Sequence, residues 1–129
     1  MLELKYQYGR LSYRRKSTGL ERGREDWSLT RNRDGSTTMR CLAMTDDSRF
    51  VRDVVFTRNK EGRPMDAFVR LQVEARLVGA GYFRVDGGRL LVVADGPEFG
   101  HAEQTLKIPN EPFSLVTHAV MLDGWAVFN

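Results

Sequence analysis

The chain has 129 residues, of which 41% are hydrophobic and 29% are charged, and its formal net charge is +3. This length suits a single domain of ordinary size and excludes a second catalytic domain. The composition is that of a globular protein and excludes the highly charged, apolar-poor class of disordered chains.

The first five residues alternate apolar and charged side chains, and no later run approaches the ~20 apolar residues of a membrane span. Cys41 is the single cysteine, which is typical of a reducing compartment and leaves no disulfide to stabilise the fold. We therefore expect a cytoplasmic protein that has no membrane partner.

Strand-like alternation begins at the N-terminus. Apolar residues occupy even positions from Leu2 to Tyr8 and then odd positions at Leu11 and Tyr13. One extra residue at Gly9 would explain this change of phase, so the pattern predicts a β-bulge there.

Period-2 segments continue over 25–33, 36–45, 50–58, 65–78, 82–85, 89–95 and 101–108. Three of the connections have turn composition, namely Asn32-Arg33-Asp34-Gly35, Asn59-Lys60-Glu61-Gly62 and Asp86-Gly87-Gly88. Short connections of this kind predict a meander of antiparallel strands.

The segment from Met65 to Val78 shows the strictest alternation in the chain. As a single strand it would extend over more than about 40 Å, which is at least about twice the usual strand length. Such a strand must bend around a core, and long bent strands favour a barrel or half-barrel.

The C-terminal segment is the exception to the strand pattern. Residues 113–122 follow two prolines and suit either a short helix, with Ser114 as its N-cap, or a strand. The apolar run 125–129 would leave an open strand edge that can pair with another chain. We expect a partner subunit to cover this edge in a homo-oligomer, or else the sequence to be the first part of a longer chain.

Two stretches carry a resemblance to a known group of proteins: residues 23–29 leading to Asp34-Gly35-Ser36, and His118-Ala119-Val120-Met121-Leu122-Asp123-Gly124-Trp125. Together they resemble parts of uncharacterised bacterial proteins with lipocalin-like (calycin-like) barrels. The resemblance implies an all-β, mainly antiparallel fold with a ligand cavity and no particular ligand. Residues 1–129 would then form one β-barrel-like domain or one half of a larger barrel.

A barrel of about eight strands holds either side chains or one small ligand, so binding of a small hydrophobic or aromatic acid is the leading hypothesis. Six large side chains are candidates for the cavity wall: Trp27, Met39, Met44, Phe56, Met65 and Phe83. The candidate ligand-binding residues are Trp27, Phe68, Arg70, Arg84 and Trp125, because aromatic rings and arginine forks suit an aromatic carboxylate. Alternatively, the polar row of Arg70, Gln72, Glu74 and Arg76 is a solvated exterior.

A second hypothesis is an enzyme that acts on such a ligand. His118 and Asp123 would form its acid–base pair, in which the aspartate fixes the imidazole tautomer. His101, Glu103 and His118 have the outline of a two-histidine, one-carboxylate metal site, although such spacing also arises by chance. We expect no cofactor, and we expect Cys41 to be a buried, inert thiol.

A third hypothesis is binding of single-stranded nucleic acid by the basic N-terminal half. Its aromatic residues are interleaved with arginines: Tyr6, Tyr8, Tyr13 and Trp27 with Arg10, Arg14, Arg15, Arg22 and Arg24. Bases stack on such rings while arginines neutralise phosphates. However, Tyr6 and Tyr8 share a face with Leu2 and Leu4, which favours a role in the core.

Overall fold

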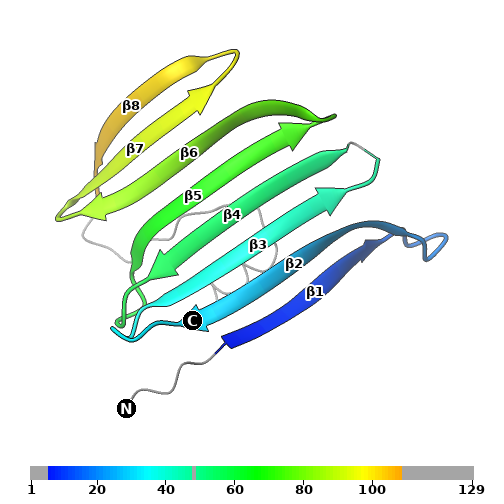
Figure 1. Cartoon of the computed structure of the whole chain (residues 1–129), viewed down its shortest axis with the longest axis horizontal. Coiled ribbons are helices and arrows are strands. Elements are labelled where there is room, and N and C mark those ends of the chain that lie inside the picture. The colour runs from blue at the N-terminus through cyan, green and yellow to red at the C-terminus, as the bar shows by residue number, and fades with distance from the viewer. Residues whose placement is uncertain (1–5, 48, 109–129) are drawn as a thin grey trace.

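The computed structural model describes residues 6–47 and 49–108. Within them the chain forms one eight-stranded antiparallel sheet, in which the strands follow one another in sequence order (Figure 1). The strands are β1 (Tyr6–Arg14), β2 (Glu21–Arg31), β3 (Thr37–Thr45), β4 (Phe50–Arg58), β5 (Pro64–Val73), β6 (Arg76–Asp86), β7 (Arg89–Gly96) and β8 (Gly100–Lys107). The predicted all-β antiparallel meander is therefore confirmed.

The three predicted turns are also confirmed. In the β2–β3 turn, Gly35 has a φ of 86° and the Asp34 carboxylate accepts hydrogen bonds from the backbone and hydroxyl of Ser36 at 2.8 and 2.6 Å. In the β4–β5 turn, the Asn59 side chain accepts from the backbone of Arg63 at 2.8 Å. Side-chain acceptors of this kind stabilise the turns that the sequence indicates.

The prediction of one long strand over residues 65–78 is wrong. The chain turns at Glu74 and Ala75, whose φ angles are 52° and 61°, so β5 and β6 form a hairpin. Positive φ at both central residues is typical of a type I′ turn, which usually contains Asn and Gly. Neither residue is present here, and the alternation of side chains continues through the turn without a break.

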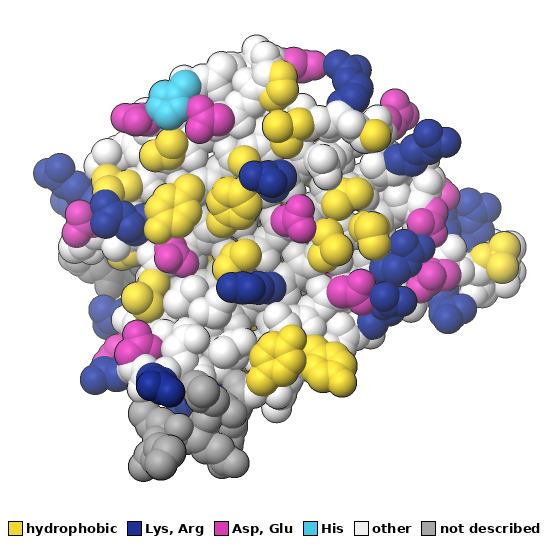
Figure 2. Space-filling view, viewed as in Figure 1, with side chains coloured by type: hydrophobic (Ala, Val, Ile, Leu, Met, Phe, Trp, Pro, Cys, Tyr) yellow, Lys and Arg dark blue, Asp and Glu magenta, His cyan; other side chains and the backbone are white. Residues whose placement is uncertain are grey.

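The sheet has two unlike faces. One face, which we call the buried face, carries a core of Met39, Cys41, Val54, Phe56 and Ala67, against which Trp27, Leu29, Val69 and Phe83 pack. The opposite face, which we call the outer face, presents apolar side chains among basic and acidic ones (Figure 2). Because side chains alternate along a strand, each strand contributes to both faces.

The predicted bulge at Gly9 is absent, since β1 and β2 pair residue by residue from Tyr6 to Tyr13. Tyr6 and Tyr8 lie instead on the outer face, where they are 62% and 75% exposed, and so they do not belong to the core. Leu11, which is half-buried, lies two residues along from Gly9 on the buried face. The shift of apolar residues from even to odd positions at Gly9 therefore marks the point where the apolar side chains of β1 change from the outer face to the buried face.

The sheet is open, with β1 and β8 as its two edges. Within the described residues these edges do not pair with each other, so no barrel is closed. The expected C-terminal helix or strand over 113–122 and the apolar run 125–129 lie outside the described residues. Among those that are described, no helix has the length and hydropathy that crossing a membrane requires.

Candidate functional site

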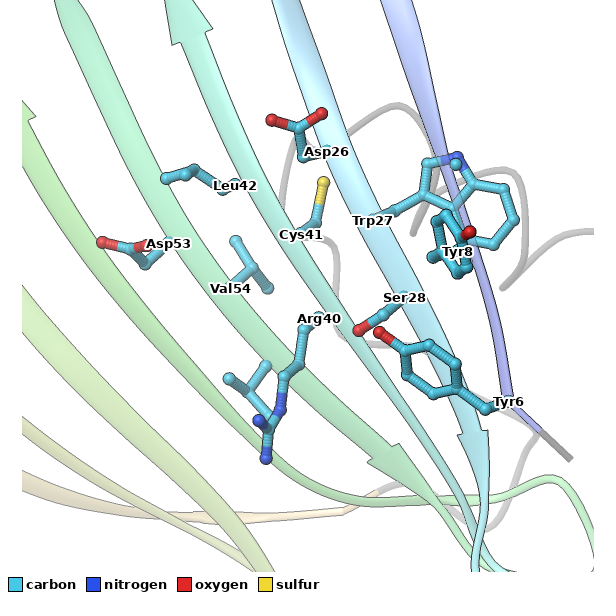
Figure 3. A pocket seen from close by; sticks show the side chains of 12 residues that line it. Tyr6, Tyr8, Asp26, Trp27, Ser28, Arg40, Cys41, Leu42, Asp53 and Val54 are labelled. Atoms are coloured by element: carbon cyan, nitrogen blue, oxygen red, sulfur yellow. The ribbon is translucent and has the colours of Figure 1, made fainter. Parts of the chain in front are cut away.

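A groove of about 410 Å³ crosses β1 to β4 on the outer face (Figure 3). Tyr6 and Tyr8 project from β1 at its edge, and Arg40 projects from β3. The remaining lining residues are Gly9, Asp26, Trp27, Ser28, Cys41, Leu42, Asp53, Val54 and Val55. The groove thus combines aromatic, aliphatic and charged groups on one side of the sheet.

The two tyrosines form the aromatic wall of this groove. Residues two apart on a strand point to the same side, and the rings of Tyr6 and Tyr8 lie with their centroids 5.9 Å apart at an interplanar angle of 36°. Beneath them, the indole of Trp27 packs across Gly9, where a Cβ atom would lie 2.6 Å from the ring. Glycine at position 9 therefore lets the indole lie close to the backbone of β1.

Arg40 is the cation of the groove. It is exposed, and it pairs across the sheet with Ser28 on β2 and Val55 on β4. Within the described part of the chain no carboxylate pairs with it, whereas Asp26 forms hydrogen bonds with Arg10 at 2.6 and 3.2 Å. The guanidinium of Arg10 also holds the pKa of Asp26 below its usual value. Arg40 can therefore accept an anionic ligand without breaking an ion pair.

Two of the predicted ligand-binding residues border this groove. Phe68 lies opposite Val55, and Arg70 lies opposite Asp53, with its guanidinium carbon 5.6 Å from the centre of the Phe68 ring. Arg84 is one strand further away, on β6, where it lies opposite Asp66. Trp27 lies within the groove lining, and Trp125 lies outside the described residues.

The six candidates for a cavity wall do not surround a common space. Met39 and Phe56 are buried in the core, and Trp27 and Phe83 pack against it. Met44 lies on the outer face, as the sheet register shows, and Met65 is 39% exposed. The large side chains of the buried face therefore form packed core rather than the wall of a ligand chamber.

An ionisable cluster lies within the buried face. The Glu25 side chain is fully buried, accepts a hydrogen bond from the Tyr13 hydroxyl and lies 3.5 Å from the sulfur of Cys41. Arg52 belongs to the same row, because Ala43 pairs with Glu25 on one side and with Arg52 on the other. Burial of charged groups is expensive unless they are paired, so this cluster is a specific feature of the core.

Burial and the neighbouring Glu25 carboxylate raise the pKa of the Cys41 thiol and the pKa of the Tyr13 hydroxyl. The pKa of the Cys41 thiol rises from 9.0 to about 12, chiefly through desolvation and then through repulsion by Glu25. Desolvation, followed by the hydrogen bond to Glu25, likewise raises the pKa of Tyr13. The prediction that Cys41 is buried is confirmed. Since the thiolate is the nucleophilic form, the raised pKa also disfavours a reactive thiol.

His101 lies on β8 between two carboxylates. Its Nδ1 is 2.5 Å from Asp95 and its Nε2 is 3.0 Å from Glu103, and hydrogen bonding to Asp95 and then to Glu103 raises its pKa. Both ring nitrogens therefore lie within hydrogen-bonding distance of carboxylates. No trio of His, Cys, Asp or Glu among the described residues is arranged to hold a metal ion. His118 and Asp123 lie outside the described residues.

The outer-face residues of the groove that sequence reasoning missed are Asp26, Ser28, Arg40, Leu42, Asp53 and Val55. Along their strands these residues alternate with residues of the buried face, so their side chains point to the outer face. A signal was present in the change of phase at Gly9, which placed Tyr6 and Tyr8 on the face opposite Leu11. The same face of β3 and β4 then carries Arg40 and Val55.

Comparison of the chain with models of known protein families, with curated proteins and with solved structures finds no match. The functional interpretation accordingly rests on the geometry of the sheet and on the chemistry of its outer face.

Proposed function

We propose that the outer-face groove binds a small aromatic acid. The observation that carries this proposal is that the exposed Tyr6–Tyr8 ring pair and the exposed Arg40, with which no carboxylate of the described residues pairs, converge on one groove. Its volume of about 410 Å³ falls within the range of small-molecule sites, roughly 300–1,000 Å³.

Each part of the groove has a role in this proposal. The tyrosine rings offer faces and edges against which an aromatic ring can stack in offset or tilted geometry. The Arg40 guanidinium presents two parallel donors to a carboxylate, and the hydroxyl of the neighbouring Ser28 can donate a third hydrogen bond. Leu42 and Val55 supply apolar surface between these polar groups, which favours a hydrophobic ligand over a small inorganic anion.

The proposed ligand class is the one expected from the sequence, but the proposed site differs, because it is an open groove and not a barrel cavity. Closure of the sheet into a lipocalin-like barrel or half-barrel stays a prediction. Catalysis by His118 and Asp123 also stays a prediction.

Isothermal titration calorimetry with 1-naphthoate tests the proposal, with 1-naphthamide as an uncharged ligand of the same shape. We expect the carboxylate to bind and the amide to bind at least about tenfold more weakly, since a charge-assisted hydrogen bond is worth ~1.5–3 kcal/mol. Arg40→Gln should abolish this preference. Arg89→Gln, an exposed arginine on β7 outside the groove, should leave it unchanged. Equal binding of both ligands, or equal effects of both variants, would contradict the proposal.

A second function, binding of single-stranded nucleic acid, is favoured by one separate observation. A surface pocket of about 610 Å³ near the β1–β2 connection is lined by Tyr13, Arg14, Arg15, Lys16, Arg22, Thr45 and Asp47. Asp47 is the one acid among these lining residues, and it pairs with Arg22. The exposure of Tyr6 and Tyr8 also removes the objection that they belong to the core.

Fluorescence anisotropy with a labelled oligothymidylate tests this second function. We expect binding at low salt that weakens steeply as salt is added, because phosphate contacts release counterions. A paired Arg15→Gln, Lys16→Gln variant should weaken binding and reduce the salt dependence. No anisotropy change at low salt would exclude the function.

A further inference from the structure

Strand β8 is an edge of the sheet that the described residues form. All eight of its residues, Gly100–Lys107, are exposed, and in the described chain it pairs only with β7. It contains no proline, and its register with β7 has no bulge. Natural proteins usually protect edges with such devices, because an exposed edge is a template for pairing with another chain.

The backbone groups available on this edge can be assigned from the register. The Ile108 amide donates to the Gly88 carbonyl at 2.8 Å, which directs the even-numbered backbone groups of this segment toward β7. Since successive backbone groups alternate in direction, the amides and carbonyls of His101, Glu103, Thr105 and Lys107 point away from the sheet. Their side chains also share the outer face.

Two-fold symmetric pairing of β8 with itself allows three registers near the middle of the strand. Centring on Glu103 places two glutamates opposite each other, and centring on Gln104 places His101 opposite Lys107. Centring on Thr105 places Glu103 opposite Lys107 twice, once in each half of the pair, with Thr105 opposite its own copy. Opposite charges and threonine pairs stabilise adjacent strands, whereas like charges destabilise them.

We infer that a second copy of this chain docks antiparallel on β8, in the register centred on Thr105. The two sheets then join edge to edge, and each copy contributes the same strand, as a two-fold interface requires. Leu106, which is 45% exposed, gains apolar neighbours from the partner's strand. The other edge, β1, suits self-pairing less well, because its charged residues, Arg10 and Arg14, are both positive.

A charge-swap experiment on the full chain tests the partner and the register. Sedimentation velocity over two decades of protein concentration should show a concentration-dependent dimer. Glu103→Lys and Lys107→Glu should each raise the dimer dissociation constant at least about fivefold, because each places like charges opposite each other twice. The double variant should restore dimerisation, which loss of folding in a single variant could not mimic. A monomer at every concentration, or no rescue by the double variant, would overturn the inference.

Disulfide trapping supplies a second readout. Under mild oxidation Thr105→Cys should form a covalent dimer, since directly opposite strand residues lie within the Cα separation of a disulfide. Ser12→Cys, on the outer face of β1, should not form one. Crosslinking of Ser12→Cys alone, or only in a mixture of the two variants, would show that β1 takes part and would overturn the inference.

Discussion

The hydroxyl of Tyr13 on β1 donates a hydrogen bond to the carboxylate of Glu25 on β2, whose side chain is fully buried. Tyr13 lies opposite Gly23, two residues from Glu25, so the bond runs diagonally between the two strands. It ties the edge strand, which carries Tyr6 and Tyr8, to the core of the sheet. This polar contact lies on the buried face, opposite the face that carries the aromatic wall of the groove.

Removal of this hydroxyl should destabilise the protein. Tyr13→Phe removes one donor from a buried carboxylate, and we expect a loss of about 1–3 kcal/mol in the free energy of unfolding measured in urea. Tyr82→Phe is the matched control, because that ring is exposed on β6 and its change should have little effect. Equal losses in the two variants would show that the Tyr13 bond contributes nothing specific.

The Cys41 thiol should make stability fall at alkaline pH. Its pKa is raised from 9.0 to about 12 in the folded protein, so between these values the unfolded chain loses a proton that the folded chain keeps. Stability is therefore complete below pH 9 and declines above it, by about 1.4 kcal/mol per pH unit for such a group. Tyr13, whose pKa is also raised, adds to the decline above its ordinary value of 10.0.

Urea unfolding from neutral pH to about pH 11 measures this dependence. Cys41→Ser should make the decline shallower between pH 9 and 10, where the tyrosine contribution has scarcely begun. An unchanged slope in that interval would contradict the assignment of the raised pKa to Cys41.

The close approach of Trp27 to Gly9 should make this glycine intolerant of a side chain. A Cβ atom there would meet three atoms of the indole at 2.6–2.9 Å, so Gly9→Ala must displace the ring. We expect a loss of roughly 1–3 kcal/mol and a change in tryptophan fluorescence. Gly88→Ala has open space around the new Cβ atom and should be close to neutral. A neutral Gly9→Ala would show that the indole can move freely.

The β5–β6 turn should be improved by glycine. Ala75 has a φ of 61°, a conformation that costs a residue with a Cβ atom energy and costs glycine none. Ala75→Gly should therefore raise the free energy of unfolding by about 0.5–1 kcal/mol. The same substitution at Ala80, within β6, should lower it, because glycine weakens a strand. Thermal unfolding of the two variants measures whether each substitution raises or lowers stability.

The sequence predicts much of this fold because most of its turns carry a chemical signal. Asp34-Gly35 and Gly87-Gly88 supply residues that tolerate positive φ, and the alternation on either side fixes the strands. Glu74 and Ala75 carry no such signal, so the β5–β6 hairpin could not be found from turn composition. Tertiary pairing of β5 with β6 imposes the turn there against local preference.

Less of the candidate site could be predicted, because a groove depends on which face of the sheet is left open. Phe68 and Arg70 border the outer-face groove, since alternation puts them opposite the apolar row, and their role in ligand binding stays a prediction. Arg40 could not be selected from sixteen arginines, because its place in the groove, opposite Ser28 and Val55, depends on pairing between strands. Spacing along the chain does not contain that information.

Nuclear magnetic resonance titration with 1-naphthoate tests the central claim most directly, because it locates the ligand as well as detecting it. The ring signals of Tyr6 and Tyr8 and the guanidinium signal of Arg40 should shift together and saturate at one ligand concentration. Those of Tyr82 and Arg89 should not move. Saturable shifts confined to core residues such as Phe56 and Met39, or no saturable shifts at all, would contradict binding in the outer-face groove.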